Sequence, residues 1–286
     1  MTIAPILKLT PGIVTENFLA LNGVSYEPVP RAYTHPQSPN IYPELRNLSI
    51  ERTARKIDDP AVLLCGGPHG ADSYWHWLID YLPRASWLNR DIDSFSAHLP
   101  LIVNNDLSAV QIDTLDAYYR SGYSDHIRKM PGEWLHCRTL YVPPFLSDTG
   151  YVTPEAVDFL RRVWTWKRPF KGGPERIYLS RGDLPARALP FERELEKILF
   201  EKHGFAIRVP HEMTFFEQVD MMMSASVVMA PHGGAMANLA FARPAVDFYE
   251  IMTKPTHTAG PSICKAAGHN HIAVPTGSLK AVLDAL

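Results

Sequence analysis

Short apolar runs alternate with helical segments through the second half of the chain. Runs typical of buried strands occupy residues 176–180, 205–209, 227–230 and 245–250. Segments with helical character lie between them, at residues 190–203, 215–224 and 235–241. Strands separated by helices predict a parallel sheet that is covered by helices on both faces. Such sheets bind ligands at the carboxyl ends of their strands, so we expect the functional residues there.

The first half has a less regular pattern, and prolines exclude long helices before residue 60. Strands are expected at residues 61–65, 101–104 and 140–143. Helices are expected from Asp72 or Ser73 to Pro83 or slightly beyond, at residues 107–121, and at residues 154–166 with Thr153 as the N-cap. The basic segment Lys167–Pro174 contains two glycines and two prolines, which is typical of a linker. We therefore expect two domains, residues 1–166 and 167–286.

The composition is that of a globular protein. The 286 residues are 46% hydrophobic and 20% charged, and they suffice for two domains of ordinary size. A net charge of −2 gives no reason to expect nucleic acid or an anionic membrane as a partner. The three cysteines lie far apart, which favours a reduced, intracellular setting over a disulfide framework. The sequence shows neither a signal peptide nor an apolar run long enough to span a membrane, so a cytoplasmic protein is expected.

The stretch Val227–Pro244 combines a strand, a turn and the start of a helix. The turn is His232-Gly233-Gly234, where glycine permits backbone dihedrals that other residues avoid. Free N–H groups at a helix start, together with the helix dipole, favour an anionic ligand such as a phosphate. A tight strand-to-helix connection without a ligand explains this stretch equally well.

Other polar residues are expected near the same edge of the sheet. Arg181 follows a strand and could bind a phosphate bidentately, and Arg187 could add a second positive charge. Glu250 ends a strand and could accept hydrogen bonds from both hydroxyls of a ribose, while Asn238 could reach the same ligand from the first turns of the helix. The alternatives are a surface arginine pair, an exposed acid at a strand end and an amide on a helix surface.

His76 and Asp80 form the candidate acid–base pair of the first half. Their i, i+4 spacing places them on one face of a helix. Apolar residues form the other face, so both side chains are expected outside the core. A carboxylate beside an imidazole can act as a general base that takes a proton from a hydroxyl nucleophile. The alternative is a surface pair that only stabilises the helix.

A metal site is a further alternative. His69, His76, Asp80 and His232 are enough nitrogen and oxygen ligands for one metal ion, as in a metal-dependent hydrolase. The chain lacks the HExxH, paired-cysteine and Asp-x-Asp motifs that would favour this interpretation. A non-catalytic module that binds a nucleotide or glycan is a third interpretation.

Four blocks of the sequence resemble, in the right order, the motifs of glycosyltransferase family 61, once known as DUF563. They are SYWHWLIDYLPR (73–84), RIYLSRGDLPAR (176–187), FEREL (191–195) and the stretch from MTFFEQ to NLAFARP (213–244). The resemblance covers about residues 73–250. The chain departs from the family pattern at Ser73, Phe191 and Ala230, and at Gly234-Ala235-Met236, where the glycine is displaced by one position.

The resemblance implies an α/β fold of the GT-B type, in which two Rossmann-like domains face each other across a cleft. Residues 1–166 would form the acceptor domain and residues 167–286 the nucleotide-sugar domain. The implied activity is inverting transfer of a sugar from a nucleotide-sugar to a hydroxyl of a glycan or lipid-linked glycan, in bacterial surface polysaccharide synthesis. No cofactor and no metal are implied. The protein would be cytoplasmic, free or peripheral to the inner face of the membrane.

The resemblance also implies roles for single residues. The donor-binding residues would be Arg181 and Arg187 at the diphosphate, His232, Gly233 and Gly234 in the donor turn, and Glu250 at the ribose, with Asn238 nearby. His76 and Asp80 would face the donor from the N-terminal domain. From their chemistry we expect Asp80 to be the general base, with His76 orienting it or sharing the role.

Overall fold

The computed structural model describes all residues except 1–4, 16–19, 24, 26–28, 31–53, 65–72, 90–98, 120–125, 148–149, 166–167, 185–188 and 253–257. Contacts divide the chain into two compact units, Met1–Thr149 and Gly150–Leu286. The division into an acceptor domain (1–166) and a donor domain (167–286) is a statement about roles, and it stays a prediction.

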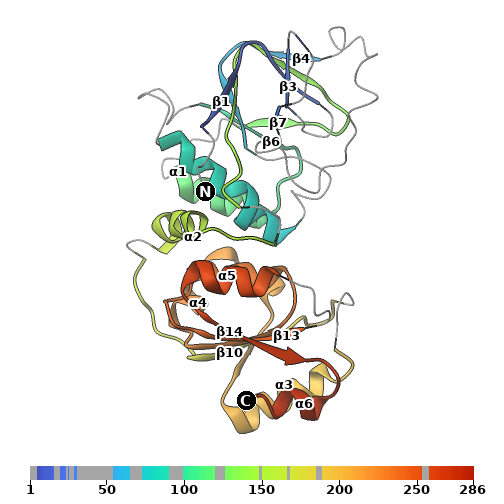
Figure 1. Cartoon of the computed structure of the whole chain (residues 1–286), viewed down its shortest axis with the longest axis vertical. Coiled ribbons are helices and arrows are strands. Elements are labelled where there is room, and N and C mark those ends of the chain that lie inside the picture. The colour runs from blue at the N-terminus through green and yellow to red at the C-terminus, as the bar shows by residue number, and fades with distance from the viewer. Residues whose placement is uncertain are drawn as a thin grey trace. The chain divides into compact units, whose positions relative to one another are not determined.

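The first unit contains two sheets that share one hydrophobic core (Figure 1). The larger sheet has the order β1-β9-β5-β6-β7, where β1 (Leu7–Leu9) is antiparallel to β9 (Leu140–Val142). The parallel strands β5 (Ala61–Leu63), β6 (Leu101–Asn104) and β7 (Ile127–Lys129) complete it. The smaller sheet consists of β3 (Ala20–Asn22), β2 (Gly12–Val14), β8 (Leu135–Cys137) and β4 (Arg55–Ile57), in that order.

The helices of the first unit differ in type from the expectation. The segment expected to form one helix ending near Pro83 contains a π-helix, η4 (His76–Tyr81), followed by a 3-10 helix, η5 (Leu82–Asn89). Pro83 is tolerated because it lies in the first turn of η5, where its missing N–H is not needed. The helix expected at residues 107–121 forms as α1 (Ala109–Tyr119).

The second unit is built on a parallel sheet of five strands, which confirms the pattern expected for this half. The order is β11-β10-β12-β13-β14. The strands are β10 (Arg176–Leu179), β11 (Ala206–Arg208), β12 (Val227–Pro231), β13 (Asp247–Met252) and β14 (Asn270–Pro275), and every neighbouring pair is parallel. Helices α4 (Phe215–Ser224) and α5 (Ala259–Ala267) cover one face, while α3 (Glu192–His203) and α6 (Leu279–Leu283) cover the other (Figure 1).

Four further elements belong to the second unit. They are α2 (Pro154–Leu160), the π-helix η7 (Arg161–Thr165), the 3-10 turn η8 (Pro210–Glu212) and the 3-10 helix η9 (Gly234–Phe241). The N-cap expected at Thr153 is confirmed, because its side chain accepts a hydrogen bond from the Ala156 N–H. The helix expected at 235–241 is η9, so the element after the glycine turn is a tighter helix than expected.

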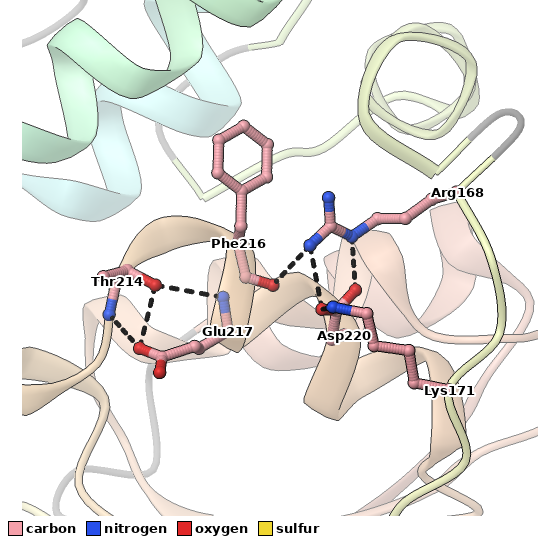
Figure 2. Close-up of polar contacts among 6 residues, drawn as sticks. All are labelled: Arg168, Lys171, Thr214, Phe216, Glu217 and Asp220. Carbon is pink, nitrogen blue, oxygen red and sulfur yellow. Dashed lines mark hydrogen bonds and ion pairs between the residues drawn. The ribbon is translucent and has the colours of Figure 1, made fainter.

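The described part of the expected linker, residues 168–174, is bound to α4 by ion pairs and hydrogen bonds (Figure 2). Arg168 forms an ion pair with Asp220 through two nitrogens, and its guanidinium lies 4.8 Å from the centre of the Phe216 ring. The Lys171 Nζ lies 3.0 Å from an Asp220 oxygen. Thr214 and Glu217 form a capping box at the start of the same helix. This segment therefore belongs to the packed structure of the second unit.

Candidate functional site

The turn His232-Gly233-Gly234 lies at the carboxyl end of β12, in the centre of the parallel sheet. The His232 N–H donates to the Ile251 carbonyl at 3.1 Å, which ties the turn to β13. The Met236 N–H donates to the Gly233 carbonyl at 3.1 Å as η9 begins. The sheet thus presents this turn at the edge where parallel α/β sheets bind ligands.

Arg181 lies directly against this turn. It follows β10, which pairs in parallel with β12, so the ends of the two strands are neighbours. A Cβ atom built on Gly233 would come within 2.7 Å of the Arg181 Nη1. Because residue 233 is a glycine and has no side chain, the guanidinium of Arg181 can lie close to the turn. The structure brings Arg181 and the turn together, as the sequence suggested, while Arg187 lies outside the described residues.

A buried carboxylate on α3 holds the backbone that carries Arg181. The Oε1 of Glu192 accepts hydrogen bonds from the Arg181 N–H at 3.0 Å and from the Tyr178 hydroxyl at 3.1 Å. Burial, and then the neighbouring charge of Glu192, raise the pKa of Tyr178, so its hydroxyl stays protonated and donates. Glu196, one turn further along α3, accepts from Ser180, which in turn accepts from the Gly182 N–H.

Glu250 lies on β13 and is fully buried between two histidines. Its Oε1 lies 2.5 Å from the Nδ1 of His232, and its Oε2 lies 2.6 Å from the Nε2 of His271. Burial alone would raise the pKa of Glu250, but the hydrogen bonds to the two histidines outweigh burial and lower it. The alternative of an exposed acid at a strand end is therefore wrong, because the carboxylate has no exposed surface. Ribose binding by Glu250 stays a prediction.

Asn238 lies in the interior of the second unit, so the alternative of a surface amide is also wrong. Its Nδ2 donates to the Oε1 of Gln218 at 2.8 Å, and the Gln218 amide donates to the Met213 carbonyl at 3.3 Å. These bonds link η9 to α4. A contact between Asn238 and a donor stays a prediction.

In the first unit, His76 and Asp80 contact each other as their spacing predicted. The Nδ1 of His76 lies 2.6 Å from the Oδ2 of Asp80. Their burial differs, because the side chain of His76 is 14% exposed and that of Asp80 only 1%. The expectation that both lie outside the core is wrong for Asp80, since residues 77–82 are buried on every side of this π-helix. Of the pair, His76 is the member that reaches the surface of the unit.

Arg84 holds this helical segment against the ends of two strands. Its Nη1 donates to the Leu64 carbonyl after β5, and its Nε and Nη2 donate to the Pro143 carbonyl after β9, at 2.6–2.9 Å. Its guanidinium also lies 4.3 Å from the centre of the Phe145 ring. The His76–Asp80 pair is thereby carried by a segment that is anchored at the carboxyl ends of parallel strands.

Among the described residues, no group of three or more His, Cys, Asp or Glu side chains could hold a metal ion. His69, one of the four ligands considered from the sequence, lies outside these residues. Likewise, no helix in the described part of the chain is long and apolar enough to cross a membrane.

Sequence reasoning did not single out Arg84, Glu192 or His271 as single residues. Arg84 and Glu192 stand in the blocks that carry the family resemblance, but their partners are distant backbone groups that no spacing reveals. His271 lies on β14, a strand that the sequence pattern did not predict. The apolar run after Gly268, which ends α5 in a left-handed conformation, is the signal that could have revealed it.

The fold and the site define a class of protein: an α/β protein with an arginine and a glycine turn at adjacent strand ends, an arrangement suited to phosphate-bearing ligands. The chain belongs to the glycosyltransferase 61 family, because the model of that family matches residues 74–249, more than half of its length. It is thus a glycosyltransferase, which transfers a sugar from a donor to an acceptor. No curated protein matches the chain.

Proposed function

We propose that this protein transfers a sugar from a nucleotide-sugar donor to a hydroxyl group of a glycan or lipid-linked glycan, with inversion at the anomeric carbon. The main observation in support of the donor site is that the guanidinium of Arg181 lies beside Gly233, where a side chain would collide with it. A guanidinium beside a turn of backbone groups is suited to the diphosphate of such a donor.

In this proposal the second unit stabilises the leaving group. As the bond between the sugar and the diphosphate breaks, negative charge grows on the diphosphate oxygen. Glu192 already holds the backbone of Arg181 beside the turn. The positive charge of Arg181 can therefore stabilise the transition state with little reorganisation of the chain. We infer that this charge replaces a divalent metal ion. His232 is part of the same turn, and the buried carboxylate of Glu250 orients its ring.

In the first unit we infer that His76 is the general base and Asp80 orients it. A carboxylate that accepts from Nδ1 leaves Nε2 as the basic nitrogen of a neutral imidazole. The acceptor oxygen forms the new bond to the anomeric carbon while its proton passes to Nε2 of His76. The nucleoside diphosphate leaves with the electrons of the broken bond. Because Asp80 is more deeply buried than His76, it is better placed to orient the imidazole than to take the proton itself.

The GT-B arrangement is part of the proposal, with the acceptor in the N-terminal half and the donor in the C-terminal half. It is supported by the parallel sheet of the second unit, by the parallel strands β9, β5, β6 and β7 of the first, and by residues of the right chemistry at strand ends. A role in bacterial surface polysaccharide synthesis, in the cytoplasm or at the inner face of the membrane, belongs to the same proposal.

The test is donor turnover in the presence of a chelator. The purified protein is incubated with a panel of UDP-, GDP- and CMP-sugars, with and without glycan acceptors, and released nucleotide and product are measured by mass spectrometry. We expect nucleotide to be released from one of these donors, and we expect the same turnover in the presence of EDTA. No turnover of any donor without metal, but turnover once a divalent ion is added, would contradict the metal-independent mechanism and favour a metal-dependent enzyme.

A further inference from the structure

His271 lies on β14, outside the residues that the family model matches, and it contacts the carboxylate that holds His232. In the pairing of the two strands it lies opposite Phe248, two residues before Glu250. Side chains two residues apart on a strand share a face, so His271 and Glu250 leave the same side of the sheet. The His271 ring also lies against the Phe248 ring, with 6.1 Å between the ring centres.

Small residues surround the Glu250 carboxylate. Ala230 on β12 and Ala273 on β14 lie directly beside Glu250 in the sheet. Gly260 on α5 lies so close to the Oε2 of Glu250 that a Cβ atom there would collide with it. These three positions leave room for two imidazole rings to reach the carboxylate, one at each oxygen.

The hydrogen bonds fix where the protons lie. An ionised carboxylate only accepts hydrogen bonds, so each histidine must donate to it. His232 therefore carries its proton on Nδ1, and His271 carries its proton on Nε2. The nitrogen with which His232 can meet a ligand thus depends on Glu250 staying charged and in place.

We propose that His271 is a positioning residue of the donor site, which holds the second oxygen of Glu250 and thereby keeps His232 in the tautomer protonated on Nδ1. The inference rests on the proposed function, in which the His232 turn binds the donor diphosphate. Without His271, the Oε2 of Glu250 is a buried charged oxygen that has lost its hydrogen bond, which is unfavourable. Glu250 then takes up a proton or turns, and either change frees His232 from a single tautomer.

The groups around Glu250 come from three neighbouring elements. His232 follows β12, His271 lies on β14, and Gly260 and Cys264 lie on α5. Burial, and then the negative charge of Glu250, raise the pKa of Cys264 to about 12, so the thiol is neutral.

The direct test is nitrogen NMR of ¹⁵N-histidine-labelled protein without any ligand. In the unaltered protein we expect the Nδ1–H tautomer at His232 and the Nε2–H tautomer at His271. The opposite tautomer at either residue would overturn the proposal, and this measurement requires no variant to fold.

Two pairs of variants test the coupling. His271→Leu removes the donor to Glu250, and we expect a mixture of tautomers at His232, whereas His271→Gln keeps an N–H donor and restores the single tautomer. Gly260→Ala displaces the Oε2 of Glu250 and is expected to act like His271→Leu. Gly277→Ala is its control, because nothing lies within 4 Å of a Cβ atom there. Unchanged His232 signals in both His271→Leu and Gly260→Ala contradict the coupling.

Pyrophosphate binding, measured by calorimetry over a pH series, separates this inference from the proposed function. We expect His271→Leu to weaken binding about tenfold, the equivalent of one orienting hydrogen bond, and to change its pH profile. His271→Gln should bind as the unaltered protein does. Binding that is the same in all three proteins leaves the donor site standing and overturns the role of His271. If pyrophosphate does not bind at all, the donor site is contradicted, while the tautomer measurement still decides the role of His271.

Discussion

His76 and His232 each place Nδ1 against a buried carboxylate, at 2.6 Å and 2.5 Å. With Nδ1 bonded to the carboxylate, the second nitrogen, Nε2, is basic when the ring is neutral and a donor when it is protonated. The two histidines therefore suit two tasks, one taking a proton from an acceptor and the other contacting an anionic donor. Which task each performs follows from its surroundings, because Arg181 lies beside the turn of His232.

Asp80→Asn is expected to abolish transfer while donor binding survives. Asparagine cannot hold the Nδ1–H tautomer as a charged carboxylate does, and the corresponding change in a serine protease triad costs about 10⁴-fold in turnover. His76→Gln should cause a loss of similar size. Turnover and calorimetric donor binding are measured on the same preparations, with thermal melting as the control for folding. Equal losses of binding and turnover in Asp80→Asn would show that the pair is not an acid–base pair.

At the residue scale, the sequence predicted contacts that depend on local spacing. The i, i+4 separation of His76 and Asp80 was sufficient to predict their contact. The burial of Asp80 was not predictable, since it depends on a π-helix that is surrounded by other elements. The pairing of Glu250 with His271 depends on the order of strands in the sheet, which no local pattern encodes.

At the scale of elements, α4 is the helix whose ends and flanks are most fully explained by its sequence. Thr214 and Glu217 satisfy its N-terminus through a capping box, and Asp220 on its surface binds Arg168 and Lys171 (Figure 2). The hydrogen bond from Arg168, opposed in part by burial and assisted by Lys171, lowers the pKa of Asp220. The basic segment before β10 is thus held to the helix by charge.

Asp220→Asn is expected to lower the free energy of unfolding by about 1–2 kcal/mol at pH 7, because it removes charge-assisted bonds at a partly buried position. The lowered pKa means that Asp220 stabilises the fold fully above its unfolded pKa of about 3.9, and this contribution is lost as pH falls through its folded pKa. The difference between variant and parent should therefore shrink below about pH 4. Denaturant unfolding of both proteins over a pH series measures this difference in unfolding free energy.

Asp183→Asn is the matched control for this change. Asp183 lies 3.6 Å from Arg193 with both side chains almost fully exposed, so its loss should change stability little. If both variants lose a similar free energy of unfolding at pH 7, and this loss stays the same at lower pH, the role given to the Arg168–Asp220 pair is contradicted.

Between residues 176 and 250, the expected elements form within about two residues of their predicted bounds. The strand after residue 227 and the helix at 215–224 form where their apolar patterns place them. The types of η4, η5 and η9 were not predictable, because packing against neighbouring elements selects π or 3-10 geometry. The unpredicted α5 and β14 lie beyond the resemblance, and they complete the surroundings of Glu250.

At the scale of the whole molecule, the proposed donor site lies both in the second unit and within the residues that the family model matches. The family model covers Arg181 and the His232 turn, and the structure brings them together at adjacent strand ends. The sequence suggested this convergence because carboxyl ends of parallel strands share one edge of a sheet. It could not suggest that Glu192 would hold the backbone of Arg181 or that Glu250 would hold His232, since both contacts join different elements of the fold.

The central claim is that Arg181 and the His232 turn bind the diphosphate of a nucleotide-sugar. Calorimetry with UDP, GDP, ADP and CDP in the presence of EDTA tests it most directly, with Arg181→Ala as the variant. Arg193→Ala is the control, because Arg193 is a highly exposed arginine on the helix that follows. We predict that one nucleoside diphosphate binds without metal, that Arg181→Ala weakens it at least about tenfold, and that Arg193→Ala does not. Binding of none of the four, or equal binding by Arg181→Ala and the parent, contradicts the account.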